Sequence, residues 1–194
     1  PHPSIEISDP ELCYGYFGRV ITGIKVAKSP SALRYRLSAC GIRPISNVVD
    51  VTNYILMECG QPLHSFDLAR IRGGRVIVAP AKEGEHFTTL DGKERVLKAD
   101  DLTIRDNDGV VALAGVMGGL DSEITEASAG VFLESAVFRP ATIRRTSRRL
   151  GLSSEASFRF ERGIDQGRSR WSLDRACAMI QQLAGGEVSD RLCE

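Results

Sequence analysis

The segment Val131–Leu150, VFLESAVFRPATIRRTSRRL, passes from a strand pattern to a helix pattern. Its first residues, VFL, predict a strand, whereas Pro140 in a first helical turn and Gly151 after the last turn delimit a short basic helix. Upstream, apolar runs separated by Gly- and Asp-rich turns follow one another between residues 75 and 133. Because these strands cluster instead of alternating with helices, the sequence predicts an α+β fold. We expect mixed or antiparallel β-sheet layers, partly barrel-like, flanked by helices.

Further elements are predicted on both sides of this segment. Residues 14–26 have a β-rich pattern, and hairpins are expected over 88–97 and 102–113, the second one leading into a glycine cluster. Helical spacing with capping serines and terminal glycines predicts helices that begin near Ser31 and at Ser46, the second one ending at Cys59. A further helical pattern runs from Trp171 to Leu183.

Length and composition limit the class of protein. The 194 residues suit one domain or two closely packed lobes, and 42% hydrophobic with 26% charged residues excludes a disordered chain. The formal net charge is zero, so total charge indicates no partner. No apolar run approaches the roughly 20 residues of a membrane span and no secretory signal is present, which predicts a cytoplasmic protein without a membrane partner. A first residue other than Met and an abrupt end suggest a piece of a longer chain.

The cysteines and glycines give no evidence for a metal or a nucleotide loop. The five cysteines are scattered without a CxxC pair, so we expect reduced thiols and no metal site. Residues 114–119, AGVMGG, have the glycines that an amide nest would need, but no Lys-Ser/Thr follows, and a plain turn is the preferred interpretation.

Arginine is concentrated in residues 139–170, where nine arginines stand against three carboxylates. Guanidinium groups match phosphate oxygens, so the predicted basic helix is a candidate contact for RNA. A solvated helix face with internal salt bridges explains the same pattern. The four candidates on this helix are Arg144, Arg145, Arg148 and Arg149.

Two single residues could carry chemistry. Glu134 follows the strand residues VFL, where burial of a carboxylate is costly without a partner. It lies either on a wet strand face or in a buried position where it accepts a ligand hydroxyl or amine. His64 lies just beyond the second predicted helix and is a candidate general base or substrate-orienting donor, although a lone His there also fits a structural role. No motif for a covalent nucleophile is present.

Three motifs together resemble the B3/B4 editing region of the beta subunit of bacterial phenylalanyl-tRNA synthetases. They are GIRPISNVVDVTNYILMECGQPLHSFD (41–67), LAGVMGG (113–119) and FLESAVFRPATIRRTSRRLGLSSEASFRFERGID (132–165). The resemblance extends from about residue 19 to 185 and implies a single B3/B4-type editing domain over 1–194, excised from a longer beta subunit. In one departure, Ser154 stands where members often carry Thr, which keeps the hydroxyl and removes a methyl.

The resemblance implies hydrolysis of tyrosine mistakenly esterified to the phenylalanine tRNA. The synthetic site cannot strongly reject tyrosine, because tyrosine differs from phenylalanine only by an added hydroxyl. In the editing site, Glu134 would accept a hydrogen bond from that phenolic hydroxyl. A water aided by the terminal ribose hydroxyl would attack the ester, with His64 orienting the substrate. The implied catalytic set is His64, Thr52 and Asn53, and the implied substrate-binding set is Glu134, Ala156, Ser154, Gly115, Gly118 and Arg43.

The resemblance also implies partners. These are mischarged tRNA(Phe) and the synthetase alpha subunit, with no DNA, and no cofactor in this domain. ATP and Mg²⁺ would serve the parent enzyme, which ligates phenylalanine to tRNA(Phe). A non-catalytic RNA- or protein-docking module of the synthetase is the alternative function.

Overall fold

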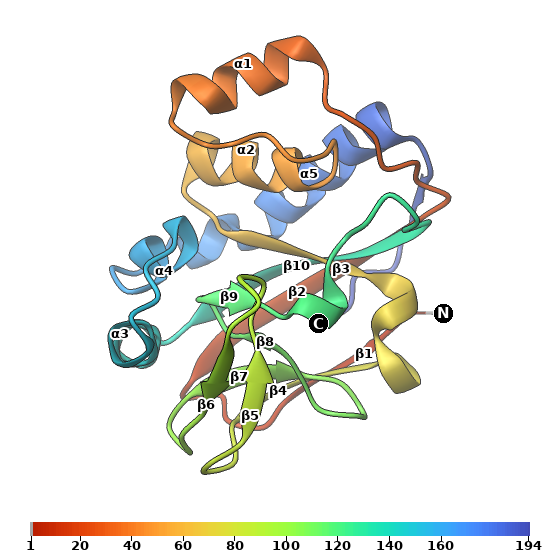
Figure 1. Cartoon of the computed structure of the whole chain (residues 1–194). Helices are drawn as coiled ribbons and strands as arrows, with labels where there is room; N and C mark the ends of the chain where they lie inside the picture. Colours follow the sequence, from red (N-terminus) through yellow and green to blue (C-terminus); the bar gives the residue numbers. More distant parts are fainter. Residues whose placement is uncertain (1) are drawn as a thin grey trace.

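A computed structural model describes residues 2–194 and shows two main β-sheets with helices on one side and at one end (Figure 1). Helices α1, α2 and α5 cover one face of the four-stranded sheet, and the five-stranded sheet lies below its other face. The α+β class with mixed and antiparallel sheets is confirmed. Among residues 2–194 no closed barrel forms, so the partly barrel-like arrangement is not found.

The four-stranded sheet has the order β11-β2-β10-β3, the five-stranded sheet β1-β4-β7-β8-β9, and β5 and β6 form a hairpin. The strands are β1 (Ser4–Ile7), β2 (Cys13–Thr22), β3 (Leu63–Asp67), β4 (Arg75–Pro80), β5 (His86–Thr88), β6 (Glu94–Val96), β7 (Leu102–Arg105), β8 (Val110–Leu113), β9 (Met117–Gly118), β10 (Gly130–Phe138) and β11 (Glu187–Val188). The helices are α1 (Ser31–Ala39), α2 (Val49–Cys59), α3 (Pro140–Leu150), α4 (Glu155–Phe160) and α5 (Ser169–Ala184), with short 3-10 turns η1 (Leu68–Arg70), η2 (Arg72–Gly74), η3 (Leu120–Ser122) and η4 (Gln166–Arg168).

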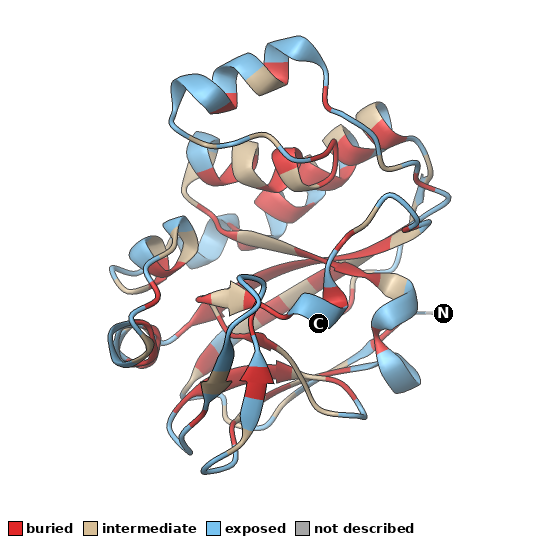
Figure 2. Ribbon diagram, viewed as in Figure 1, coloured by how far each residue is buried: buried red, intermediate tan, exposed pale blue. Residues whose placement is uncertain are grey.

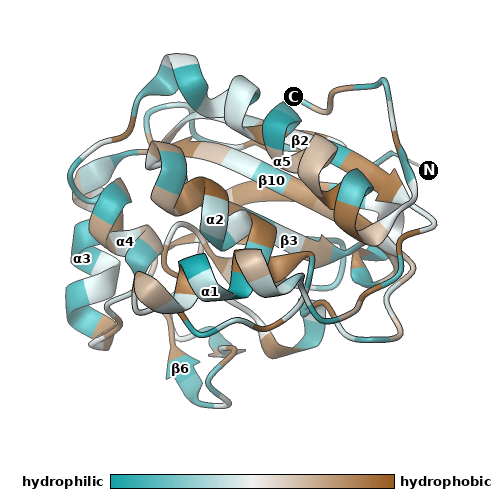
Figure 3. Cartoon of the chain, turned by 90° about the horizontal axis from the view of Figure 1, so that it is seen from above, coloured by the Kyte–Doolittle hydropathy of each residue, from teal (hydrophilic) through white to brown (hydrophobic). Residues whose placement is uncertain are grey.

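Strand β10 lies at the centre of the molecule, and both of its faces are buried. Successive side chains of a strand point to opposite faces, so Phe132 and Ala136 pack in the core shared with the five-stranded sheet. Val131 and Leu133 pack on the other face, in the core formed with α1, α2 and α5. Figure 2 shows this strand buried along most of its length, and Figure 3 shows the helices lying over it. Its near-continuous apolar sequence follows from this double burial.

Helix α2 begins later than the sequence predicts. The first helical residue is Val49, whereas Ser46 lies in the preceding turn and its hydroxyl accepts the amide of Val49 at 3.3 Å. Asp50 holds this turn by accepting the amide of Ile45 at 2.7 Å. Gly60 ends the helix as predicted, in the left-handed conformation with φ of 78°.

Strand β3 starts soon after α2 and was not predicted. Its five residues, LHSFD, pair antiparallel with β10, which places Ser65 and Phe66 in buried positions. The edge strands β1 and β11 were also missed, because short strands at an edge carry little sequence pattern. Within the part of the chain that is described, no helix has both the length and the apolar character needed to cross a membrane.

Candidate functional site

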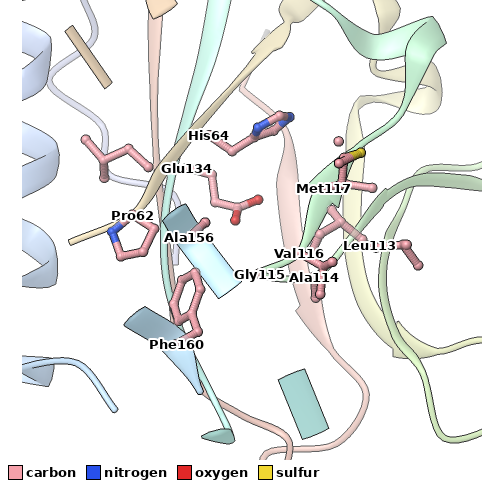
Figure 4. A pocket seen from close by; sticks show the side chains of 14 residues that line it. Pro62, His64, Leu113, Ala114, Gly115, Val116, Met117, Glu134, Ala156 and Phe160 are labelled. Carbon is pink, nitrogen blue, oxygen red and sulfur yellow. The ribbon is translucent and has the colours of Figure 1, made fainter. Parts of the chain in front are cut away.

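A small cavity of about 70 Å³ opens where the two sheets meet α4 (Figure 4). Its wall is apolar except for His64, Glu134 and backbone groups. The lining residues are Pro62, Leu63, His64, Ile104, Ala112, Leu113, Ala114, Gly115, Val116, Met117, Gly118, Glu134, Ala156 and Phe160.

Glu134 supplies the carboxylate of the cavity from the middle of β10. The residue is only 6% exposed, so the wet-face interpretation is wrong. The hydroxyl of Tyr16 donates a hydrogen bond of 2.6 Å to Oε2, and no other donor among residues 2–194 reaches the carboxylate. Burial raises the pKa of Glu134 from 4.5 to about 7, while the hydrogen bond from Tyr16 opposes the rise. Figure 4 shows the carboxylate directed into the cavity between His64 and Ala156.

His64 lies directly opposite Glu134 in the register of β3 and β10, so both side chains point to the cavity face. Its ring meets the ring of Phe66 edge to face with centroids 4.4 Å apart. Burial lowers the pKa of His64 from 6.5 to about 4, which leaves the imidazole neutral at pH 7. A neutral imidazole has one donor and one acceptor nitrogen, and it can therefore orient a bound group or a water.

The glycine segment forms the turn between β8 and β9. Gly115 has φ of +66°, and a Cβ there would lie 2.9 Å from Phe160 Cδ2. The amide of Val116 bonds to the carbonyl of Leu113 at 3.0 Å, which is ordinary turn geometry and confirms the plain-turn interpretation. At Gly118 a Cβ would lie 2.6 Å from His64 Cε1, so the missing side chain provides the space for the imidazole.

Ser154 and Ala156 stand at the start of α4 and play different parts. Ser154 is the N-cap: its hydroxyl accepts the amide of Ser157 at 3.0 Å and donates to the carbonyl of Val116 at 2.8 Å. Because both interactions are internal, Ser154 fastens α4 to the glycine turn behind the cavity wall. Ala156 is part of the wall itself, and its small side chain leaves the space below Glu134 open.

Besides Ser154, three predicted residues lie outside the cavity wall. Thr52 is buried in α2 and its hydroxyl donates to the carbonyl of Val49 at 2.7 Å, while Asn53 follows it on the same helix. Arg43 is exposed in the loop before α2. The structure thus brings together His64, Gly115, Gly118, Glu134 and Ala156, and the roles of Arg43, Thr52 and Asn53 remain predictions.

Residues 12–185 match the family described as the B3/4 domain. The chain belongs to the B3/4 domain family. It is similar to the phenylalanine–tRNA ligase beta subunits of Oleidesulfovibrio alaskensis, with 59% identity over 98% of this chain, and of Nitratidesulfovibrio vulgaris, with 58% identity over 97%. It spans 24% of the length of each of these relatives.

A solved structure shares the fold of this B3/4 domain. It is an N-terminal fragment of the phenylalanyl-tRNA synthetase beta subunit from Pyrococcus horikoshii, with a TM-score of 0.65, 12% identity, and coverage of 97% of this chain and 50% of that chain. At this identity the likeness concerns the fold alone.

The basic helix α3 of this B3/4 domain carries two kinds of arginine. Arg149 pairs with the buried Asp101, and Arg145 lies 3.1 Å from Asp100. Arg144 and Arg148 are exposed and make no ion pair with any residue in 2–194. The sequence left open whether this helix is an RNA contact or a salt-bridged face. The salt-bridged description holds for two of the four arginines, and the other two stay available to phosphate.

Sequence reasoning missed several residues of the site, above all Tyr16. This tyrosine lies on β2, 118 positions from Glu134 in the chain, so no local motif joins them. Alternation in the segment CYGYFGRV shows which residues share a face, but it does not give the register with β10. Met117 and Phe160 also line the cavity, and their apolar character is indistinguishable in sequence from that of core residues.

Proposed function

We propose that this chain is an editing domain that hydrolyses the ester between tyrosine and tRNA(Phe), within a phenylalanine–tRNA ligase beta subunit. The observation that carries the proposal is a buried carboxylate with one unbonded oxygen, Glu134 Oε1, in an otherwise apolar cavity. Such an oxygen needs a donor, and the phenolic hydroxyl of a tyrosyl group supplies one.

The same oxygen explains discrimination against phenylalanine. A site built to bond a hydroxyl rejects the analogue without it, since the buried polar group is then left unpaired. An unpaired buried acceptor costs about 1 to 3 kcal/mol, or roughly 5- to 150-fold. The apolar side chains of Met117 and Phe160 would contact the ring of either amino acid equally, so Glu134 is the element that separates them.

Hydrolysis of the ester depends more on the correct position of the attacking water than on a strong general base. The water oxygen bonds to the ester carbonyl carbon, the bond from that carbon to the ribose oxygen breaks, and a water proton passes to the departing ribose oxygen. His64 has a pKa of about 4, so it is a weak proton acceptor at pH 7. Its neutral ring therefore orients the ester or the water, and the adjacent ribose hydroxyl of the tRNA assists the proton transfer.

The larger assembly supplies the substrate. In this proposal the parent synthetase ligates phenylalanine to tRNA(Phe) with ATP and Mg²⁺, the alpha subunit completes it, and no cofactor acts in this domain. Thr52 and Asn53 stay assigned to the catalytic region near the start of α2, and Ser154 supports α4. Arg43, Arg144 and Arg148 are the exposed cations available to tRNA phosphates.

The test compares the hydrolysis of Tyr-tRNA(Phe) and Phe-tRNA(Phe) by the synthetase that contains this chain. The variants are Glu134→Ala and, as a matched control, Glu126→Ala, which removes an exposed carboxylate. We expect fast hydrolysis of the tyrosyl ester only, a loss of at least tenfold in Glu134→Ala, and no change in Glu126→Ala. Equal decay of both esters with wild type and Glu134→Ala would overturn the proposal and favour the docking module.

A further inference from the structure

Tyr16 is a buried aromatic residue whose hydroxyl is committed to the site carboxylate. It is 1% exposed in β2, and its hydroxyl lies 2.6 Å from Glu134 Oε2. In the register of β2 and β10, Tyr16 pairs with Ala136 and Glu134 pairs with Gly18, so the two residues are diagonal neighbours on one face. A long side chain reaches its diagonal neighbour.

Gly18 leaves the position opposite Glu134 without a side chain. A Cβ there would lie 2.2 Å from Phe132 Cζ, so this position has no room for a side chain that could donate to the carboxylate. Cys13, also on β2, donates its thiol to the carbonyl of Gly15 at 3.4 Å instead. Tyr16 is therefore the one group in residues 2–194 that orients the carboxylate by a hydrogen bond.

We propose that Tyr16 is a positioning residue for tyrosine recognition: its phenol holds Oε2 of Glu134, so that the carboxylate presents Oε1 to the phenol of the substrate. This inference rests on the proposed function, which it deepens. An internal tyrosine and the tyrosyl substrate would thus donate the same kind of hydrogen bond to the two oxygens of one carboxylate.

The hydrogen bond from Tyr16 favours the ionised form of the Glu134 carboxyl group. Burial favours the protonated form of Glu134, whereas a donor to the carboxylate favours the ionised form. The titratable groups that face Glu134 are Tyr16 and Cys13 from β2 and His64 from β3, and the cavity wall contributed by β8, β9 and α4 contains no titratable side chain. At neutral pH all three of these groups are uncharged, because burial raises the pKa of Tyr16 and Cys13 and lowers that of His64. Within residues 2–194, no cation near Glu134 can take over the role of the Tyr16 hydroxyl.

The test is the pH profile of kcat/KM for Tyr-tRNA(Phe) between pH 6 and 9, with Tyr16→Phe against wild-type synthetase. We expect a loss of about fivefold at pH 7 in Tyr16→Phe, an acidic limb displaced upward by about one pH unit, and recovery of most of the rate by pH 9. Tyr54→Phe is the control, because it removes a hydroxyl that is bonded to Arg36 and lies in α2. Its profile should match wild type.

If Tyr16 had only a structural role, Tyr16→Phe would lower kcat/KM equally at every pH, and that result would overturn the inference. A pH profile identical to that of wild type would also overturn it. Should Tyr16→Phe fail to fold, 3-fluorotyrosine at position 16 keeps the hydroxyl and makes it a stronger donor. The acidic limb should then move to lower pH, and a fixed limb would count against the inference.

A second readout separates this inference from the proposed function. The carboxyl carbon of Glu134 in the 194-residue chain is titrated by NMR, without any tRNA. A higher pKa in Tyr16→Phe than in wild type supports the orienting role even if the wild-type synthetase hydrolyses no Tyr-tRNA(Phe), which would refute only the proposed function. If the wild-type synthetase hydrolyses Tyr-tRNA(Phe) but the pKa of Glu134 is the same in Tyr16→Phe as in wild type, only the role of Tyr16 would be refuted.

Discussion

His64 and Glu134 are cross-strand partners, paired directly in the register of β3 and β10. Directly opposed residues point to the same face of a sheet, so one pairing brings the imidazole and the carboxylate to one cavity. A shift of the register by one residue would turn His64 toward the helices and separate the two groups. The geometry of the site is thus set by the same backbone bonds that hold β3 in the sheet.

Gly118→Ala should damage the site through His64. The new Cβ would lie 2.6 Å from His64 Cε1 and 3.1 Å from Leu90 Cδ1, so the imidazole must move. We expect a loss of at least tenfold in Tyr-tRNA(Phe) hydrolysis and a stability cost of about 1 to 3 kcal/mol. Time courses of Tyr-tRNA(Phe) hydrolysis measure the loss of activity, and thermal unfolding measures the loss of stability. Gly167→Ala is the control, since its Cβ would meet only an exposed Asp165 oxygen at 3.3 Å, and full activity in Gly118→Ala would contradict the argument.

Replacement of His64 distinguishes orientation from proton abstraction. With a pKa of about 4, His64 stays neutral from pH 6 to 8, so it should give no inflection in the wild-type profile over that range. His64→Gln keeps a hydrogen-bond donor and an acceptor, so we expect the rate of Tyr-tRNA(Phe) hydrolysis to fall by about tenfold. Loss of a true general base costs about 10²- to 10⁴-fold. Single-turnover hydrolysis of the tyrosyl ester by His64→Gln decides between the two values.

Glu134→Gln should stabilise the fold in alkaline solution. The raised pKa of Glu134, about 7 against 4.5, means that the folded state holds its proton more tightly than the unfolded state. That stabilisation is complete below pH 4.5 and is lost as the pH rises through 7. The free energy of unfolding of Glu134→Gln relative to wild type should therefore increase by about 3 kcal/mol between pH 4 and 8.

Urea unfolding at the two pH values measures this difference. The lowered pKa of His64 acts in the opposite direction, since stability from it is lost as the pH falls through 6.5 and then 4. His64 is present in both proteins, so its contribution cancels in the comparison. A pH-independent difference would show that Glu134 is not buried as described.

Arg149 and Arg148 should separate stability from RNA affinity. Asp101 is 1% exposed and is bonded by Thr146 at 2.7 Å, by the amide of Lys98 at 2.8 Å and by Arg149. Arg149→Ala removes the cation from a buried carboxylate and should cost about 1 to 3 kcal/mol. Arg148→Ala should change stability by about 0.5 kcal/mol at most.

Binding of tRNA(Phe) as a function of salt completes the comparison. Each phosphate contact contributes to the salt dependence, so Arg148→Ala should weaken binding and flatten the salt slope if the exposed arginines meet phosphate. An identical slope in Arg148→Ala and wild type would leave α3 as a solvated face.

The predictable parts of the fold were those with strong local patterns. The residues VFL indicated a strand next to an unusual carboxylate, and Pro140 with Gly151 marked α3 correctly. Strand β3 was missed, because five residues in partial burial show no clear period, and its partner is more than 60 positions away. Local signals cannot reveal an element that is stabilised mainly by a distant strand.

The site divides in the same way. The chemical oddity of Glu134 was visible in sequence, but its hydrogen bond to Tyr16 depends on a register between distant strands. Ser154 was expected beside the substrate, whereas its hydroxyl is used by the amide of Ser157 and the carbonyl of Val116. A serine before a helix is also a capping residue, and sequence alone does not separate the two uses.

The double burial of β10 has a consequence for dynamics. We expect its amides to exchange with solvent only when both cores separate, which for a central strand approaches complete unfolding. The carboxylate of Glu134 therefore belongs to a segment that we expect to be among the slowest to exchange in the chain. In the proposed editing reaction, β10 would hold Glu134 in a fixed position while the aminoacyl group enters.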